Sequence, residues 1–335
     1  MNPIKKVSLL IPIYNEALFL PTLFQQIQAQ DYPTTAIEVI AVDGDSTDSS
    51  LALLKSYQRT MPALMVLRNP RRNTPSSLNL AIAQAQGDYL IRLDAHTEYA
   101  TDYVRQCVAC LEKTGADNVG GHIRIKTTNR VTQAIELATT SVFGVGNSHF
   151  HYTQYEGYVD TVYLGAYRRQ VFEKIGNYDE ALIGAEDDEL NYRLIKQGGK
   201  IYLSATIQSF YYPRDSLKKL WLQYFQYGQG KYGVIRKHTL PTSIRHLVPA
   251  LFVLSLVLGI LTSFYQGLGF YLLIPILSSY FSVLGLFTMR CTFPKALSLT
   301  GLVALVFLTL HLSYGCGFLI AGLREGLRRL HLLRA

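Results

Sequence analysis

The sequence predicts an α/β fold with a mostly parallel sheet, followed by helices that cross a membrane. Short apolar runs alternate with helical patterns through the first half of the 335 residues. This alternation is typical of a parallel sheet built from right-handed crossovers. The last third holds long stretches without a charged residue, and about 20 apolar residues are enough to span a bilayer.

Four strands are expected in the first hundred residues, each followed by a helix or a polar loop. The strands are predicted over 7–13, 37–42, 63–67 and 89–94, and the helices over 18–30, 49–58 and 76–85. Ser46 or Thr47 is expected to cap the second of these helices. Because the carboxyl ends of parallel strands meet at one edge of a sheet, Asp43 and Asp94 are expected to face one crevice.

The pattern is less even beyond residue 100. We predict helices over 101–113 and 169–175, strands near 118–125 and 159–165, and no regular structure over 129–155. A further helix opens with four consecutive carboxylates, Glu186 to Glu189, and runs to about Gln197. Acidic residues favour a helix N-terminus, which is the structural explanation. Four crowded carboxylates exceed what capping needs, and their repulsion raises the pKa of one of them, which suits a general base.

The stretch from Tyr89 to His96 begins as a buried strand and ends in a carboxylate and an imidazole. Side chains alternate along an extended chain, so Asp94 and His96 are expected to point the same way. A hard divalent cation suits the Asp94 carboxylate, and His96 accepts a manganese-like ion as well as magnesium. From these residues alone, a polar loop after a strand explains the stretch equally well.

The carboxyl-terminal third is expected to contain about three membrane spans, over 247–265, 270–288 and 297–323. A basic segment precedes them, in which Asp215 is the single acidic residue between Arg214 and Arg245. Such a segment is usual on the cytoplasmic flank of membrane helices. Nucleic-acid binding explains the basic charge less well, because no nucleic-acid motif is present.

Four short motifs stand in order at predicted strand or helix ends: Pro12-x-Tyr14-Asn15-Glu16, Asp43-Gly44-x-Ser46, Asp94-Ala95-His96 and Glu186-Asp187. Together they resemble the family 2 glycosyltransferases, which have the GT-A nucleotide-diphospho-sugar fold, over about residues 7–233. A finer pattern is similar to the succinoglycan glucosyltransferase branch of bacterial exopolysaccharide enzymes; it comprises Leu78-Asn79, Asp94-Ala95-His96, Asp160-Thr161-Val162 and Gly165 to Arg169.

The resemblance implies a role for each matched residue. The nucleotide sugar would be held by Pro12, Tyr14, Asn15, Glu16, Asp43, Ser46 and Asp94. Asp94 matches the metal-binding carboxylate of the family's D-x-D motif, and His96 stands in place of the second aspartate. The imidazole either ligates the metal or bonds the diphosphate and leaves Asp94 as the sole protein ligand. Asp187 matches the catalytic base, with Glu186 beside it.

A helix over 217–237 is expected to carry acceptor-side or membrane-side residues, namely Trp221, Gln223 and Tyr227. The family's Q-x-x-R-W motif is altered here to Gln223-Tyr224-Phe225-Gln226-Tyr227, which puts in doubt any role copied from processive synthases. Apolar and aromatic residues at spacings of three and four alternate with lysines, as in a helix that lies in the headgroup layer. The alternative is a helix packed in the core of the catalytic domain.

The resemblance further implies a division of the chain and its location. Residues 1–213 are predicted to form a cytosolic GT-A catalytic domain, 214–245 a basic interfacial segment, 246–323 the transmembrane region and 324–335 a basic tail. The amino terminus has too short an apolar run for a signal peptide. We therefore expect a multi-pass protein of the inner (plasma) membrane. Three spans would place the basic tail outside, against the positive-inside tendency, so a re-entrant third stretch is the alternative.

The residues and the resemblance together predict an inverting glycosyltransferase that extends a lipid-linked saccharide for exopolysaccharide. Its cofactor is expected to be Mn²⁺ or Mg²⁺ and its donor a UDP-sugar; its partners are the lipid-linked acceptor and the membrane, with no nucleic acid. A polyprenyl-phosphate sugar synthase is the nearest alternative, and a non-catalytic sugar-nucleotide-binding membrane protein is another. The presence of Asp43, Asp94 and Asp187 argues against loss of activity.

Overall fold

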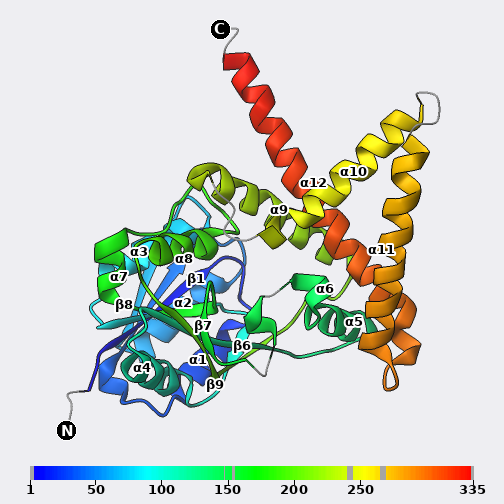
Figure 1. Ribbon diagram of the computed structural model, residues 1–335. Coiled ribbons are helices and arrows are strands. Elements are labelled where there is room, and N and C mark those ends of the chain that lie inside the picture. The colour runs from blue at the N-terminus through cyan, green and yellow to red at the C-terminus, as the bar shows by residue number, and fades with distance from the viewer. Residues whose placement is uncertain (1–3, 147, 153–154, 240–243, 265–268, 333–335) are drawn as a thin grey trace. The chain divides into compact units, whose positions relative to one another are not determined.

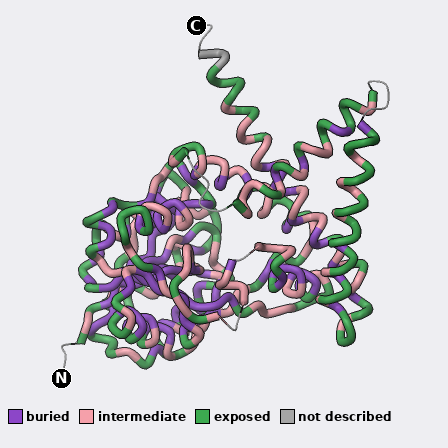
Figure 2. Tube along the Cα trace, viewed as in Figure 1, coloured by how far each residue is buried: buried purple, intermediate pink, exposed green. Residues whose placement is uncertain are grey.

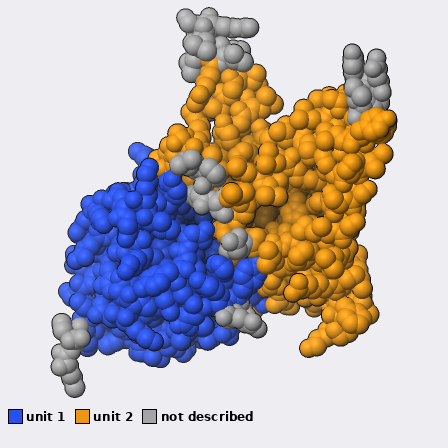
Figure 3. Space-filling view, in the orientation of Figure 1, with its two compact units in different colours: residues 1–125, 149–212 blue, residues 126–148, 213–335 orange. Residues whose placement is uncertain are grey.

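The computed structural model describes residues 4–146, 148–152, 155–239, 244–264 and 269–332 (Figure 1). The chain forms two compact units (Figure 3). The first contains residues 1–125 and 149–212, and the second contains residues 126–148 and 213–335. A short excursion from the middle of the chain therefore belongs to the same unit as the apolar carboxyl-terminal helices.

The first unit is built on a nine-stranded mixed sheet, in the order β3-β2-β1-β4-β8-β6-β9-β5, with β7 pairing with β9. The strands are β1 (Val7–Ile13), β2 (Ile37–Asp43), β3 (Leu64–Arg68), β4 (Tyr89–Arg92), β5 (Thr97–Tyr99), β6 (Asn118–Ile125), β7 (Gly157–Val159), β8 (Tyr163–Arg168) and β9 (Ile201–Tyr211). The four strands β3, β2, β1 and β4 are parallel neighbours, whereas β8 runs antiparallel to both β4 and β6. The carboxyl ends of β1, β2 and β4 therefore share one edge.

Helices cover both faces of this sheet. One face carries α1 (Leu20–Gln28), α2 (Ser50–Thr60) and α4 (Tyr103–Thr114), and the other carries α3 (Thr74–Gln84), α7 (Arg169–Ile175) and α8 (Glu186–Lys196) (Figure 1). Alternate residues of β1 serve the two cores, with Leu9 and Ile11 on the first side and Leu10 on the second. Burial on both faces explains why the strands read as continuous apolar runs.

Several predicted boundaries are confirmed, such as the strands over 7–13 and 118–125 and the helix over 169–175. The predicted ends of two strands are wrong. The strand predicted over 89–94 ends at Arg92, because the Thr97 N–H donates to the Asp94 carbonyl and turns the chain. The strand predicted over 159–165 is split into β7 and β8, which pair with different strands.

The second unit is helical. It contains α5 (Arg130–Thr139), α6 (Val142–Val145), α9 (Leu217–His238), α10 (Val248–Ser263), α11 (Gly269–Thr292) and α12 (Thr300–Leu332). Three stretches are long and apolar enough to cross a membrane, at Ile244–Ser263, Gly269–Thr292 and Leu297–Arg329, and they match the three predicted spans. The sequence also predicts a turn at 266–269 between the first two spans; residues 266–268 lie outside the described residues, and Gly269 is the first residue of α11. Figure 2 shows α10 and α11 mostly exposed, as expected of helices whose surroundings are lipid.

The region 129–155, predicted to lack regular structure, contains α5 and α6. Ala134, Ile135 and Ala138 of α5 form one apolar cluster with residues of α11 and α12. A hydrogen bond also joins α6 to α12, because His311 Nε2 donates to the Phe143 carbonyl at 2.7 Å. The excursion is thus an integral part of the second unit.

Helix α9 packs against α12 through two glycines. A β-carbon at Gly228 would overlap the Tyr314 carbonyl, and a β-carbon at Gly317 would overlap the Phe225 carbonyl. The buried positions of α9 include Leu220 and Lys231, whereas Trp221 and Tyr227 stay exposed. The predicted single apolar face is therefore divided between a packed side and an exposed side. The alternative of packing in the catalytic core is not observed, because these contacts lie in the second unit.

Gly317→Ala is expected to lower the thermal stability of the detergent-solubilised protein. Overpacking at a contact this close costs about 1–3 kcal/mol. The matched control is Gly326→Ala on the same helix, where a β-carbon meets no atom within 4 Å. Both substitutions gain the same helix propensity, so thermal unfolding of the two variants isolates the contact. Equal unfolding temperatures would show that α9 and α12 are not in close contact.

Candidate active site

The loops after β1 and β2 are held together by hydrogen bonds. Asn15 adopts a positive φ of 56°, and its backbone N–H donates to Ser46 Oγ at 3.0 Å. Its side-chain oxygen in turn accepts from the Thr47 N–H at 2.8 Å. The predicted cap by Ser46 or Thr47 is wrong, because the N-cap of α2 is Ser49. The Ser46 hydroxyl is instead used to fix the loop that carries Tyr14, Asn15 and Glu16.

Asp43, the last residue of β2, is fully buried and incompletely satisfied. Its Oδ2 accepts from the Ser46 N–H at 3.2 Å, but its Oδ1 has no hydrogen-bond partner within the described part of the chain. Burial of an unpaired polar oxygen is costly, so this atom marks a place for a ligand donor. Beside it, a β-carbon at Gly44 would lie 3.2 Å from the Ile13 carbonyl oxygen, a tight contact that glycine avoids. Tyr14 is about half exposed, and Pro12 is partly buried.

Sequence reasoning missed a second group of polar residues at this edge. Asp45, which also has a positive φ, pairs with Arg68, the last residue of β3, at 2.7 Å and with Arg72 in the loop that follows. Hydrogen bonds from Arg72 and Arg68 hold the pKa of Asp45 below its ordinary value. The pairing joins the loop after β2 to the end of β3 and the loop that follows it, so no local pattern in the sequence indicates it.

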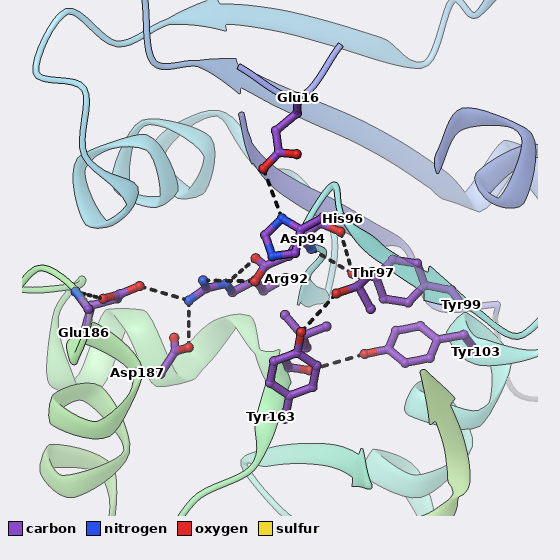
Figure 4. Close-up of polar contacts among 12 residues, drawn as sticks. Glu16, Arg92, Asp94, His96, Thr97, Tyr99, Tyr103, Tyr163, Glu186 and Asp187 are labelled. Carbon is purple, nitrogen blue, oxygen red and sulfur yellow. Dashed lines mark hydrogen bonds and ion pairs between the residues drawn. The ribbon is translucent and has the colours of Figure 1, made fainter. Parts of the chain in front are cut away.

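The turn after β4 fixes Asp94 and His96. The Tyr99 hydroxyl lies 2.7 Å from the Asp94 N–H and 3.1 Å from the Asp94 carbonyl, and Thr97 Oγ1 lies 2.9 Å from the Tyr163 hydroxyl (Figure 4). Asp94 and His96 are both partly exposed between buried neighbours, although the chain turns here and is not extended as predicted. His96 Nδ1 lies 3.0 Å from Glu16 Oε1, which brings the β1 loop to the β4 turn.

A buried asparagine anchors α8, the helix that carries the acidic pair. Asn191 Oδ1 accepts from Asn118 of β6 at 2.9 Å and from the Tyr167 hydroxyl of β8 at 3.1 Å. Its amide nitrogen donates to Thr161 at 2.9 Å. A buried amide with these partners fixes the register of the helix. The start of α8 therefore presents Glu186 and Asp187 toward β4, as Figure 4 shows.

Arg92 lies between the two predicted halves of the site, and sequence reasoning missed it. Its Nε donates to Asp94 Oδ1 at 2.9 Å, and its Nη1 donates to Asp187 Oδ2 at 2.7 Å and to Glu186 Oε1 at 3.3 Å (Figure 4). Only 10% of its side chain is exposed. Burial disfavours the charged form of Asp94, but Arg92 and His96 outweigh it and hold the pKa of Asp94 below its ordinary value. The sequence did offer a signal for Arg92, because a charged residue at the end of a buried strand needs partners of opposite charge nearby.

Asp187 has the properties of a general base. Burial raises the pKa of Asp187 to about 7; the nearby Glu186 carboxylate adds to this, and Arg92 opposes it. Its Oδ1 has no hydrogen-bond partner in the described ranges. Glu186 differs, because its Oε2 accepts from the Gly184 N–H at 2.8 Å and closes the loop before the helix. A carboxylate with a pKa near neutrality and one unused oxygen can accept a proton at physiological pH.

The residues present fit a cation that arrives together with a phosphate. No group of three or more His, Cys, Asp and Glu that could hold a metal ion occurs where the structure is described. Asp94 and His96 offer one carboxylate and one imidazole. Magnesium-like ions in nucleotide sites commonly take one or two carboxylates and complete their coordination with substrate oxygens and water. The pair suits such a site and not an all-protein metal cage.

Carboxylates after parallel strands, opposite an acidic helix start, are the arrangement of GT-A glycosyltransferases. The chain belongs to glycosyl transferase family 2, whose family model matches residues 8–176. The resemblance and the fold class predicted from the motifs are therefore confirmed.

Known proteins resemble the chain over most of its length. It is 33% identical over 243 residues to the succinoglycan biosynthesis protein ExoA of Rhizobium meliloti (strain 1021), covering 72% of this chain and 73% of that protein. It is 30% identical over 239 residues to a dolichyl N-acetyl-alpha-D-glucosaminyl phosphate 3-beta-D-2,3-diacetamido-2,3-dideoxy-beta-D-glucuronosyltransferase of Methanococcus voltae, covering 69% and 74%. The mannosyltransferase PcManGT from Pyrobaculum calidifontis, solved with GDP-Man and Mn²⁺, matches with a TM-score of 0.63 at 18% identity, covering 95% and 88%. This last likeness shows the shared fold.

The predicted site residues fall into two groups. Those assigned to the donor, the metal and catalysis lie in the first unit: Pro12, Tyr14, Asn15, Glu16, Asp43, Ser46, Asp94, His96, Glu186 and Asp187. The residues assigned to the acceptor or membrane side lie on α9 in the second unit. There, Trp221 is 37% and Tyr227 42% exposed, and Gln223 donates to the Tyr227 hydroxyl at 3.0 Å. The roles of both groups stay predictions.

Proposed function

We propose that this glycosyltransferase moves a sugar from a UDP-sugar to a lipid-linked saccharide, in a single displacement that inverts the anomeric carbon. The observation that carries the proposal is the state of Asp187. It combines a pKa of about 7 with an unpartnered oxygen, and Arg92 donates hydrogen bonds to both Asp187 and Asp94. A base and a donor carboxylate held this way suit a direct transfer.

The donor side uses residues that hold and orient the nucleotide sugar. The unpaired Oδ1 of Asp43 accepts a hydrogen bond from the nucleoside, and Tyr14 and Asn15 line the same edge. Asp94 and His96 would hold Mn²⁺ or Mg²⁺, which supplies positive charge to the departing diphosphate. The mannosyltransferase solved with GDP-Man and Mn²⁺ shares the fold, which supports a nucleotide-sugar donor and a cation of this class.

The acceptor side needs a group that removes a proton. Asp187 Oδ1 takes the proton from the attacking hydroxyl while that oxygen bonds to the anomeric carbon. The attack and the departure of the nucleoside diphosphate occur on opposite faces, so the configuration inverts and no enzyme nucleophile is needed. Glu186 holds the loop that precedes the base through its bond to Gly184.

A lipid-linked acceptor is supported by the apolar helices and by a relative. The Methanococcus enzyme is named for a dolichyl phosphate-linked sugar acceptor. Three helices long and apolar enough to cross a membrane would keep the enzyme where such acceptors reside. We propose the inner membrane as this location, with the first unit in the cytosol and residues 214–245 at the interface.

The pH dependence of kcat/KM is expected to show an acid limb near pH 7. Asp187 must be ionised to accept a proton, and its pKa is raised to about 7. Activity therefore falls about tenfold per unit as the pH drops below that value and is retained above it. Initial rates of nucleoside diphosphate release from pH 5 to pH 8 measure this. Activity that stays constant down to pH 5 would mean that Asp187 is not the base.

Lys218→Gln combined with Lys219→Gln is expected to weaken transfer to a lipid-linked acceptor in anionic vesicles but not donor hydrolysis. Both lysines are exposed, whereas Lys231 of the same helix is buried. Each lysine near an anionic surface contributes about 1 kcal/mol, and salt weakens it. The matched control combines Lys55→Gln with Lys113→Gln, because both of these lysines are exposed in the first unit. An equal effect of both pairs would refute an interfacial role for α9.

A screen of sugar nucleotides tests the function itself. Purified full-length protein is given each donor with and without Mn²⁺, together with a lipid-linked saccharide, polyprenyl phosphate or no acceptor. We expect nucleoside diphosphate release that depends on Mn²⁺ and on the lipid-linked saccharide. Release only with polyprenyl phosphate would favour the synthase alternative. Binding without any release would favour a non-catalytic sensor.

A further inference from the structure

Arg92 connects the donor half of the site to the catalytic half, although no step described above uses it. One guanidinium contacts three carboxylates, those of Asp94, Glu186 and Asp187, at 2.9, 3.3 and 2.7 Å. Asp94 is reached from Nε at 2.9 Å and from Nη2 at 3.5 Å, and the other two from Nη1. The two ends of the fork therefore serve residues that are far apart in the sequence.

We propose that Arg92 is a positioning residue, which aims the Asp187 base at the reacting centre by tying it to the donor carboxylate Asp94. This inference rests on the proposed function, because it takes Asp187 as the base. The guanidinium is planar and rigid, so its two ends cannot adjust independently. Burial of nine-tenths of the side chain prevents it from turning away into solvent. The distance between the donor carboxylate and the base is thus set by a single group.

A purely structural role explains the arrangement less well. A buried arginine needs one carboxylate to balance its charge, yet Arg92 has three, and Asp187 keeps one oxygen unbonded. Arg168 is a contrasting case at the other end of β4. It donates to the Ala116 carbonyl at 2.9 Å and to the Leu111 carbonyl, and its guanidinium lies 5.6 Å from the Tyr89 ring. That arginine ties backbone segments together and touches no proposed site residue.

The test compares Arg92→Lys with the control Arg168→Lys in the full-length protein. Lysine keeps the charge but loses the fork, so it cannot hold both carboxylates in one geometry. We expect kcat of Arg92→Lys to fall by about 10- to 100-fold, since small misplacements of reacting groups cost this much. The acid limb of kcat/KM is expected to move to higher pH, because Asp187 loses part of the attraction that favours its ionised form.

Other charged and titratable groups also face Asp187, and the Arg92→Lys and Arg168→Lys variants both retain them. They are Asp94, Glu186, Asp188 and the phenols Tyr167 and Tyr178. The control variant should therefore keep both kcat and the acid limb of the wild type, even if its thermal stability falls. A structural role for Arg92 predicts the same outcome for both variants, namely a lower thermal stability and an acid limb of kcat/KM at the wild-type pH. That result would overturn the proposal.

A double-mutant cycle decides the matter if Arg92→Lys yields little folded protein. Thermal unfolding is measured for Arg92→Lys, for Asp187→Asn and for the double variant. Coupling predicts that the loss caused by Arg92→Lys shrinks, or that folded protein is recovered, in the Asp187→Asn background. Additive effects would overturn the proposal. Full transfer by Asp187→Asn would instead refute the base assignment, whereas an inactive Asp187→Asn beside an unimpaired Arg92→Lys refutes only the role of Arg92.

Discussion

Asp187→Asn is expected to reduce transfer by about 100- to 10,000-fold while donor binding stays close to that of the wild type. Asparagine preserves the shape of the side chain and its contact with Arg92 but cannot accept the proton of the acceptor hydroxyl. The rate is measured as nucleoside diphosphate release with a lipid-linked acceptor, and donor binding is measured by calorimetry. A fall in kcat without a change in donor affinity is the signature of a lost base.

The neighbouring Asp188→Asn provides the control for the charge lost at the helix start. The Asp188 carboxylate repels the ionised form of Asp187. Asp188→Asn should therefore leave kcat within a few-fold of the wild type. If Asp187→Asn retained wild-type transfer and Asp188→Asn or Glu186→Gln abolished it, the base would be another member of the acidic turn.

Asp94→Ala is expected to abolish metal-dependent donor binding, and His96→Ala to weaken it less. The carboxylate is the stronger ligand for a hard cation. The imidazole is already engaged through Nδ1 with Glu16, at 3.0 Å. Calorimetric titration of nucleoside diphosphate at several Mn²⁺ concentrations measures both effects without requiring turnover.

Asp94→Asn serves as the control for folding, because it keeps a hydrogen-bond acceptor for Arg92 and removes the charge. We expect it to resemble Asp94→Ala in Mn²⁺ dependence and the wild type in thermal stability. A greater loss from His96→Ala than from Asp94→Ala would reverse the order of the two ligands. Donor affinity that is independent of Mn²⁺ in the wild type would show that the cation has no part in donor binding.

The sheet edge could be predicted from the sequence because its determinants are local. The strand β1 is a continuous apolar run that stops at Tyr14, and the prediction of residues 7–13 is confirmed. Asp43 and Asp94 each follow a run of this kind, so the meeting of parallel strands brings both to one edge. The start of α8 was likewise marked by its own acidic residues.

The remaining features depend on contacts between distant segments. Arg92 reaches Glu186 and Asp187 only because Asn191 fixes α8 against β6 and β8, and no spacing along the chain records this. Likewise, β9 pairs with β5, β6 and β7, so its place in the sheet follows from three partners. The second unit is similar, since α5 is stabilised by residues of α11 and α12 that come more than a hundred positions later.

The configuration of the product tests single displacement at Asp187 most directly. The linkage formed from a nucleotide sugar of known anomeric configuration can be assigned by NMR of the isolated glycolipid. Single displacement predicts inversion, so that an α-linked donor gives a β-linked product. A product that retains the donor's configuration would contradict the account, because it requires a nucleophile on the enzyme where we have placed a base.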